Sequence, residues 1–295
     1  MALQLKPLHP LFVAEATGVD ITRPLDPATV REIDAAMDRY AILVWPGQPL
    51  SQDQQMAFAM SFGTLDLGLK KLRRSANRFK YDEMIDISNV DEHGNVVPPE
   101  HGKVFDNMAN QLWHSDSSFQ KPAAKYSMLH SVVNPPWGGE TEFADLRAAW
   151  DALPERMKQR VEGLFTEHYA LHSRIMLGNT SYTPEQLNRI PPVQWPLVRT
   201  HASSGRKLLW VGVHATKVFG MTLPEGRVLL MDLLEHATQR EFVYRHHWQV
   251  GDTVMWDNRA TIHRGRPYDM TQRRELRRTT TEDPDSLNEA VPVAA

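Results

Sequence analysis

One short motif offers two metal ligands at a suitable spacing. Of the thirteen histidines in the sequence, only His114 begins a His-x-Asp triplet, which ends at Asp116. In extended backbone, residues two apart point the same way, so the imidazole and the carboxylate would face a common point. Two histidines and one carboxylate form the ligand set of non-haem Fe(II) oxygenases, which leaves coordination positions for a cosubstrate and O2. A surface histidine beside a capping aspartate would show the same spacing, so the triplet alone leaves both interpretations open.

A second histidine is available much further along the chain. Residues 253–257 and 260–263 both have the composition of strands, and His263 follows an apolar residue near the end of the second one. A ligand at that position can project into the mouth of a barrel. The alternative is a histidine packed between strands.

Two arginines predict a binding site for acidic ligands. In the predicted strand 275–280 and the residue before it, side chains alternate between faces, so Arg274 and Arg278 share one face. Two guanidinium groups on the inward face of a barrel strand are unfavourable unless anions neutralise them. The alternative is an edge strand with both faces in water.

The remaining patterns predict a mainly β fold that could position these residues. Helices are expected from Asp26-Pro27 to Tyr40, from Ser51 to Gly63, from Asp145 to about Leu164 with a break at Pro154, after Thr183-Pro184, and from Pro224 to about Thr238. Strands are expected at 41–45, 125–133 and 141–144, and in two hairpins, 197–201 with 207–213 and 242–248 with 253–257. Many strands with flanking helices favour a sandwich or jelly roll. No glycine motif supports a Rossmann or P-loop fold.

Residues 64–105 show no sustained period and predict a long loop, either an active-site lid or a disordered stretch. We expect a single domain over residues 1–295, with the lid inside this loop.

Composition excludes several other classes of protein. The 295 residues include no cysteine, which rules out disulfides, thiolate metal sites and a cysteine nucleophile. A net charge of −3 gives no overall reason to expect nucleic-acid binding, and the basic residues between Lys70 and Lys80 have no docking element around them. There is no apolar run long enough for a membrane span and no secretory signal, so the expected location is cytoplasmic.

Several segments together resemble the taurine/2,4-D dioxygenase family, whose members depend on Fe(II) and 2-oxoglutarate and have a double-stranded β-helix, a relative of the jelly roll. The segments are 110–119, 138–145, Trp256-Asp-Asn-Arg259, His263-Arg264 and the pair Arg274 and Arg278. The similarity runs from about Pro7 to Thr281. It is greatest to the 2,4-dichlorophenoxyacetate branch, through residues 47–55 and 235–244.

The resemblance implies a role for each matching position. It implies that His114, Asp116 and His263 are iron ligands and that Thr141 and Arg274 bind the distal carboxylate of 2-oxoglutarate. It also implies that Arg278 contacts the acid group of the substrate. Asn110, Lys71 and His214 would lie near the substrate. A guanidinium can hold a carboxylate through two bonds while a hydroxyl donates to it, which suits Arg274 and Thr141. For Lys71 a solvated lysine in a basic loop stays open, and for His214 a satisfied core histidine.

The resemblance also implies the reaction. With Fe(II), 2-oxoglutarate and O2, such an enzyme would form succinate and CO2 and hydroxylate the carbon next to the ether oxygen of an aryloxyalkanoate such as 2,4-dichlorophenoxyacetate, giving a phenol and glyoxylate. The same chemistry on a sulfonate such as taurine, or on another aromatic acid, is an alternative. A jelly-roll protein that binds acidic ligands without turnover is a third. The expected partners are a small anionic aromatic substrate and further copies of the chain in a homo-oligomer, with no nucleic acid and no membrane.

Overall fold

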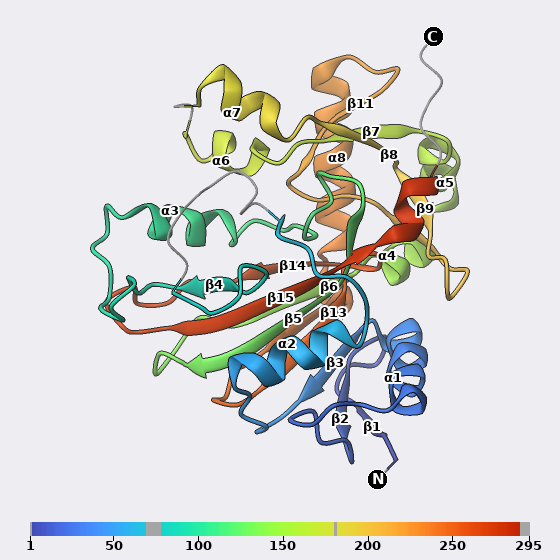
Figure 1. Cartoon of the computed structure of the whole chain (residues 1–295). Helices are drawn as coiled ribbons and strands as arrows, with labels where there is room; N and C mark the ends of the chain where they lie inside the picture. Colours follow the sequence, from blue (N-terminus) through green and yellow to red (C-terminus); the bar gives the residue numbers. More distant parts are fainter. Residues whose placement is uncertain (1, 69–77, 180–181, 290–295) are drawn as a thin grey trace.

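Two β-sheets form the centre of the computed structural model, which describes residues 2–68, 78–179 and 182–289 (Figure 1). The larger sheet has the strand order β1 (Gln4–Pro7), β2 (Ala14–Thr17), β3 (Ile42–Trp45), β13 (Thr253–Asp257), β5 (Ala123–Val133), β15 (Glu275–Asp283) and β4 (Ile85–Ser88). The smaller sheet has the order β12 (Val243–His246), β6 (Thr141–Asp145) and β14 (Thr261–Gly265). Neighbouring strands in both sheets are antiparallel, except that β2 and β3 are parallel.

Side chains from both sheets meet in one apolar core. Phe143 of β6 packs against Trp256 of β13 with ring centroids 5.5 Å apart, and Leu276 of β15 belongs to the same buried cluster. His263 of β14 borders this core, because its ring lies 4.7 Å from the Trp256 ring. The packing between the sheets therefore fixes the position of one of the predicted metal ligands.

The other face of the larger sheet is covered by two helices, α1 (Pro27–Tyr40) and α2 (Gln52–Met60) (Figure 1). Asp26 caps α1 through its side chain, and Ser51 forms a capping box with Gln54 at the start of α2. Phe58 of α2 packs edge-on against Trp45 of β3, with ring centroids 5.4 Å apart. The sequence predicted both helices and the strand between them, and the structure confirms them.

A second group of elements packs beside the smaller sheet. It contains α4 (Leu146–Ala152), α5 (Glu155–Val161), α8 (Leu223–Ala237), a sheet of β11 (Ala215–Val218), β7 (Phe165–His168) and β8 (Val193–Pro196), the hairpin of β9 (Val198–Thr200) with β10 (Lys207–Leu209), and the 3-10 helices η2 (Arg240–Phe242) and η3 (Pro284–Asn288). Three short helices, α3 (Gly102–Ala109), α6 (His172–Met176) and α7 (Pro184–Arg189), lie on one side of it (Figure 1). The predicted hairpin of 197–201 with 207–213 and the helices after Thr183 and near 224–238 are confirmed.

The predicted hairpin of 242–248 with 253–257 is wrong. β12 pairs with β6 in the smaller sheet, whereas β13 lies between β3 and β5 in the larger one. Residues 247–252 therefore carry the chain from one sheet to the other, and the Asp252 carboxylate fixes this crossing by accepting from the backbone N–H groups of Gln249 and Gly47. A connection of six residues can close a hairpin or cross between packed sheets, and side-chain alternation does not distinguish the two.

Residues 64–105 contain more regular structure than predicted. The short strand β4 pairs with β15, and α3 begins at Gly102. Residues 69–77, which include Lys71, lie outside the described residues. Because β15 has neighbours on both sides and Arg277 is buried as well as Arg274, the alternative of an edge strand with two wet faces does not apply. In the described part of the chain, no helix has the length and apolarity needed to cross a bilayer.

Candidate metal centre

The backbone brings the two predicted histidine ligands together. His114 lies in the segment between α3 and β5, and it forms an isolated antiparallel bridge with His263 of β14. The two residues exchange N–H···O=C bonds of 3.0 and 2.8 Å. Residues opposite each other in an antiparallel pair place their side chains on one face. The ring centroids are accordingly 4.2 Å apart.

Asp116 completes a cluster of three possible ligands. One ligand atom from each of His114, Asp116 and His263 can be chosen so that all lie within 4.8 Å of one another. The Asp116 carboxylate oxygens are 4.0 Å from His114 Nε2 and 3.9 Å from His263 Nε2. All three side chains are buried. Two imidazoles and a carboxylate that converge on one point are the donor set of a non-haem Fe(II) site.

The hydrogen bond of the His114 ring leaves its Nε2 nitrogen available to bind a metal. Its Nδ1 is 2.7 Å from the carbonyl oxygen of Leu112, and because a carbonyl only accepts, Nδ1 carries the proton. Nε2, which faces Asp116, then has its lone pair available. Burial lowers the pKa of His114, and burial together with the charge carried by a protonated His114 lowers the pKa of His263 well below its ordinary value. Both imidazoles are therefore neutral at neutral pH, as metal binding requires.

Asp116 is held by residues that come from distant strands. Ser127 of β5 donates its hydroxyl to the carboxylate over 2.7 Å, and Asn258, just after β13, donates its amide to the Ser127 oxygen over 2.9 Å. The side-chain oxygen of Asn258 also accepts the backbone N–H of Asp116 at 3.1 Å. Neither residue was predicted from the sequence to have a role, although Asn258 lies in the Trp-Asp-Asn-Arg segment that carried part of the family resemblance.

Asp116 is also ionised and paired. Burial raises the pKa of this carboxyl, but Arg278 and the two histidines outweigh that effect and lower the pKa to about 2. Arg278 Nη1 donates to one Asp116 oxygen over 2.6 Å. The site thus presents a carboxylate anion with one guanidinium beside it.

A small cavity of about 50 Å³ next to His263 contains the second predicted arginine. Arg274 is buried, and its Nη2 donates to the carbonyl of Gly139 over 2.9 Å, while its Nε has no hydrogen-bond partner among the residues described. Burial lowers the pKa of Arg274 to about 10, and Arg274 forms no ion pair with any residue that the structure describes. A buried cation without an anion is the feature expected of a site built for an anionic ligand.

Two neighbours shape this small cavity. Thr141 of β6 accepts the indole N–H of Trp248 over 3.0 Å, which leaves its own hydroxyl hydrogen free to donate to a ligand. Gly139 has φ +73, and a Cβ there would lie 2.9 Å from Arg274 Nε. Glycine is therefore required both by the backbone conformation and by the close approach of the guanidinium.

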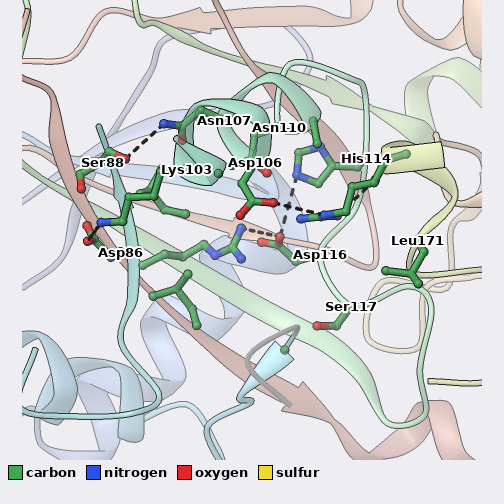
Figure 2. A pocket seen from close by; sticks show the side chains of 18 of the residues that line it. Asp86, Ser88, Lys103, Asp106, Asn107, Asn110, His114, Asp116, Ser117 and Leu171 are labelled. Atoms are coloured by element: carbon green, nitrogen blue, oxygen red, sulfur yellow. Dashed lines mark hydrogen bonds and ion pairs between the residues drawn. The ribbon is translucent and has the colours of Figure 1, made fainter. Parts of the chain in front are cut away.

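A larger cavity of about 500 Å³ opens on the other side of His114 and Asp116 (Figure 2). Its apolar lining includes Ile85, Ile87, Phe119, Leu171 and Val213. The side chains of Asn107, Asn110 and Asp106 extend from α3 toward this cavity (Figure 2). His114, Asn110 and Arg278 line both cavities, so the cluster of ligands lies between them.

The structure also places the remaining predicted site residues. Asn110 ends α3, and its carbonyl accepts from Gly265 of β14 at 2.8 Å. His214 lines the large cavity, with its ring 4.9 Å from Phe119 and 6.2 Å from His114. Its Nδ1 has no hydrogen-bond partner among the described residues, which is not the pattern of a satisfied core histidine. Lys71 lies outside the described residues.

Comparisons with known proteins agree over nearly the whole chain. The family model described as taurine catabolism dioxygenase TauD, TfdA family matches residues 4–280. The alpha-ketoglutarate-dependent 2,4-dichlorophenoxyacetate dioxygenase of Cupriavidus pinatubonensis is 59% identical over 283 residues, which cover 96% of this chain and 99% of that protein. The (S)-phenoxypropionate/alpha-ketoglutarate-dioxygenase of Sphingobium herbicidovorans is 37% identical over 281 residues, which cover 92% of each chain. The crystal structure of AAD-2 in complex with Mn(II) and N-oxalylglycine matches with a TM-score of 0.92 and 44% identity, over 96% of this chain and 98% of that chain.

Proposed function

The chain belongs to the taurine catabolism dioxygenase TauD, TfdA family, and on that premise we propose that it oxidises an aryloxyacetate such as 2,4-dichlorophenoxyacetate. It is a 2-oxoglutarate-dependent non-haem iron dioxygenase, with Fe(II) as its metal and 2-oxoglutarate and O2 as cosubstrates. The proposed products are a phenol and glyoxylate from the substrate, and succinate and CO2 from 2-oxoglutarate. One atom of O2 enters succinate and the other enters the hydroxylated carbon, whose hemiacetal then breaks at the ether C–O bond.

We propose that His114, Asp116 and His263 hold the iron, which when bound supplies the oxidative chemistry with O2. The residues fit such an ion, because two neutral imidazole nitrogens and an ionised carboxylate converge in a buried site. Ser127 and Asn258 hold Asp116 in position, which is the usual role of groups that hydrogen-bond a metal ligand.

We propose that Arg274 and Thr141 bind the distal carboxylate of 2-oxoglutarate in the small cavity. The unpaired buried guanidinium of Arg274 is the observation that carries this assignment, since a dianionic cosubstrate supplies the missing negative charge. N-oxalylglycine, the compound bound to AAD-2, has the carbon framework of 2-oxoglutarate with one methylene replaced by N–H.

We propose that the large cavity encloses the aryl ring and that Arg278 directs the acid group of the substrate. The apolar part of the lining and the volume of about 500 Å³ suit an aromatic ring with substituents. Arg278 lies where the two cavities meet, so a carboxylate held there places the adjacent carbon close to the metal centre.

We also propose that the two facing sheets form the double-stranded β-helix of the family and that the chain acts as one domain. The support is that the candidate site takes residues from 114 to 278 and that β3, early in the chain, pairs with β13, near its end. A cytoplasmic location and assembly into a homo-oligomer stay predictions.

The direct test is product analysis with the Fe(II)-loaded protein. We expect phenol and succinate in equal amounts from 2,4-dichlorophenoxyacetate, and much less product from each enantiomer of 2-(2,4-dichlorophenoxy)propionate and from taurine. His263→Ala should form no succinate in the same assay. Sulfite released from taurine without phenol from any aryl ether would replace the aryloxyacetate proposal by the sulfonate alternative.

A further inference from the structure

The large cavity contains another cation close to the metal centre. Arg174 of α6 lines it together with His114 and His214, and its side chain is only 12% exposed. The Arg174 side chain and both histidine rings therefore border the same space.

Among the described arginine and lysine side chains that line this cavity, Arg174 forms the longest ion-pair contact. Its Nε is 3.4 Å from a carboxylate oxygen of Asp106, and its Nη1 is 3.3 Å from the Ser173 hydroxyl. Charge-assisted hydrogen bonds are normally about 2.7–2.9 Å long. By contrast, Arg278 reaches Asp116 at 2.6 Å, and Arg78 and Lys103 reach Asp86 at 2.7 and 2.6 Å.

The partner of Arg174 comes from a different helix and is itself part of the cavity wall. Asp106 lies on α3, and Figure 2 shows its carboxylate directed into the same cavity as His114 and Asp116. A guanidinium has five N–H donors, and the hydrogen bonds of Arg174 with the described residues use two of its three nitrogens. A carboxylate ligand could accept from the donors that remain.

We propose that Arg174 binds the acid group of the substrate jointly with Arg278, and that Asp106 positions Arg174 and moderates its charge. This inference rests on the proposed function. Arg278 holds Asp116 through Nη1 and keeps further donors for the acid group, while its charge is already offset by the Asp116 carboxylate. Arg174, which reaches the same cavity from α6, adds a second cation that can donate to the other carboxylate oxygen.

The experiment separates the effect of charge from that of shape by comparing 2,4-dichlorophenoxyacetate with its neutral amide, 2,4-dichlorophenoxyacetamide. Four variants of the iron-loaded enzyme are compared with the wild type: Arg174→Met, Arg174→Lys, Asp106→Asn and the control Arg206→Met. Arg206 pairs with Asp151 at 2.6 Å on the surface, so its loss removes a paired arginine outside the cavity. Steady-state KM and kcat are measured for both compounds, together with the KM for 2-oxoglutarate.

We expect Arg174→Met to raise the KM for the acid by about tenfold, the loss of one charged hydrogen bond, and to change the KM for the amide by less than about twofold. Arg174→Lys should recover part of the loss, and Asp106→Asn should lower the KM for the acid because the remaining cation is no longer neutralised. Arg206→Met should change neither value. Equal shifts for acid and amide, or an unchanged KM for the acid in Arg174→Met, would overturn the role of Arg174.

A binding measurement keeps this inference distinct from the reaction itself. If wild-type enzyme forms no phenol from either compound, the proposed function fails. Titration of 2,4-dichlorophenoxyacetate into the anaerobic enzyme with Fe(II) and 2-oxoglutarate, followed by tryptophan fluorescence, then still tests Arg174. A Kd about tenfold weaker in Arg174→Met supports the contact, and an equal Kd contradicts it.

Discussion

Replacing Asn258 by alanine tests whether the network around Asp116 positions the metal ligand. In the wild type, the Asn258 side-chain oxygen accepts the backbone N–H of Asp116 at 3.1 Å and the indole N–H of Trp256 at 3.0 Å. Its amide donates to Ser127 over 2.9 Å, and Ser127 donates to Asp116 over 2.7 Å. Asn258, Trp256 and Ser127 are all fully buried, so water cannot readily replace the lost groups.

The expected loss of stability in Asn258→Ala follows from the buried groups that lose their hydrogen-bond partner. Two buried donors lose their acceptor, and each unsatisfied buried group costs about 1–3 kcal/mol, so the free energy of unfolding should fall by about 2–6 kcal/mol. Losing the support of a metal ligand typically weakens metal binding by about 10–100-fold, and we expect a change of this size in the Kd for Fe(II) or Mn(II).

Two measurements decide the outcome. Urea unfolding of the metal-free protein gives the loss of stability, and anaerobic metal titration gives the Kd. Asn134→Ala is the matched control, because Asn134 is hydrogen-bonded to Ser131 and to the carbonyl of Trp248 but not to a metal ligand. If Asn258→Ala binds metal as tightly as the wild type, or if Asn134→Ala weakens binding equally, the positioning role of Asn258 is refuted.

Three further predictions address other parts of the site and fold. Arg274→Gln should raise the KM for 2-oxoglutarate by about tenfold or more while changing the KM for the aryl substrate little, as measured by succinate formation; the opposite pattern would exchange the roles of the two arginines. Asp66→Asn should weaken metal binding by about tenfold, because the Asp66 carboxylate accepts the hydroxyl of Ser117, the residue after Asp116, over 2.5 Å, and an unchanged Kd would count against this. Burial, reinforced by a nearby arginine, lowers the pKa of His168 to about 3. Between pH 6.5 and 3 the unfolded chain therefore binds more protons than the folded one, so the free energy of unfolding falls as the pH decreases. His168→Phe should therefore make urea stability less dependent on pH in this window, by up to about 1.4 kcal/mol per pH unit, and parallel profiles for the two proteins would contradict the argument.

The predicted metal ligands were found together, although the local geometry differs from the expected one. The spacing of His114 and Asp116 predicted an extended backbone through both residues. In the structure His114 alone forms a bridge, with His263, and Asp116 begins a turn in which Ser117 has a φ of +49. The turn still directs the carboxylate to the imidazoles, because Ser127 and Asn258 hold it there. The His-x-Asp triplet identifies the residue types that can bind the metal. It carries no information about the distant residues that hold the Asp116 carboxylate in place.

The residues that sequence analysis missed share a physical reason. Asn258 acts on Asp116 across 142 positions of the chain, and Arg174 acts on the cavity from a five-residue helix. Neither belongs to an apolar period, so hydrophobic patterning contains no signal for them. Apolar spacing identified the helix over residues 27–40, and the capping box identified the helix over 52–60. Side-chain alternation failed at the crossing of 247–252 because the strands on either side pair with different neighbours.

The charges around the two cavities argue for a monoanionic substrate independently of its ring. Both histidines are neutral, Asp116 offsets Arg278, and Asp106 offsets Arg174, so among these described groups Arg274 is the one arginine without a carboxylate partner. Fe(II) adds two positive charges, and 2-oxoglutarate removes two. One positive charge remains, and a substrate with a single carboxylate neutralises it. In a buried site of low dielectric constant a neutral or dianionic substrate would leave a net charge, so the acid group should contribute to affinity whatever aromatic group fills the large cavity.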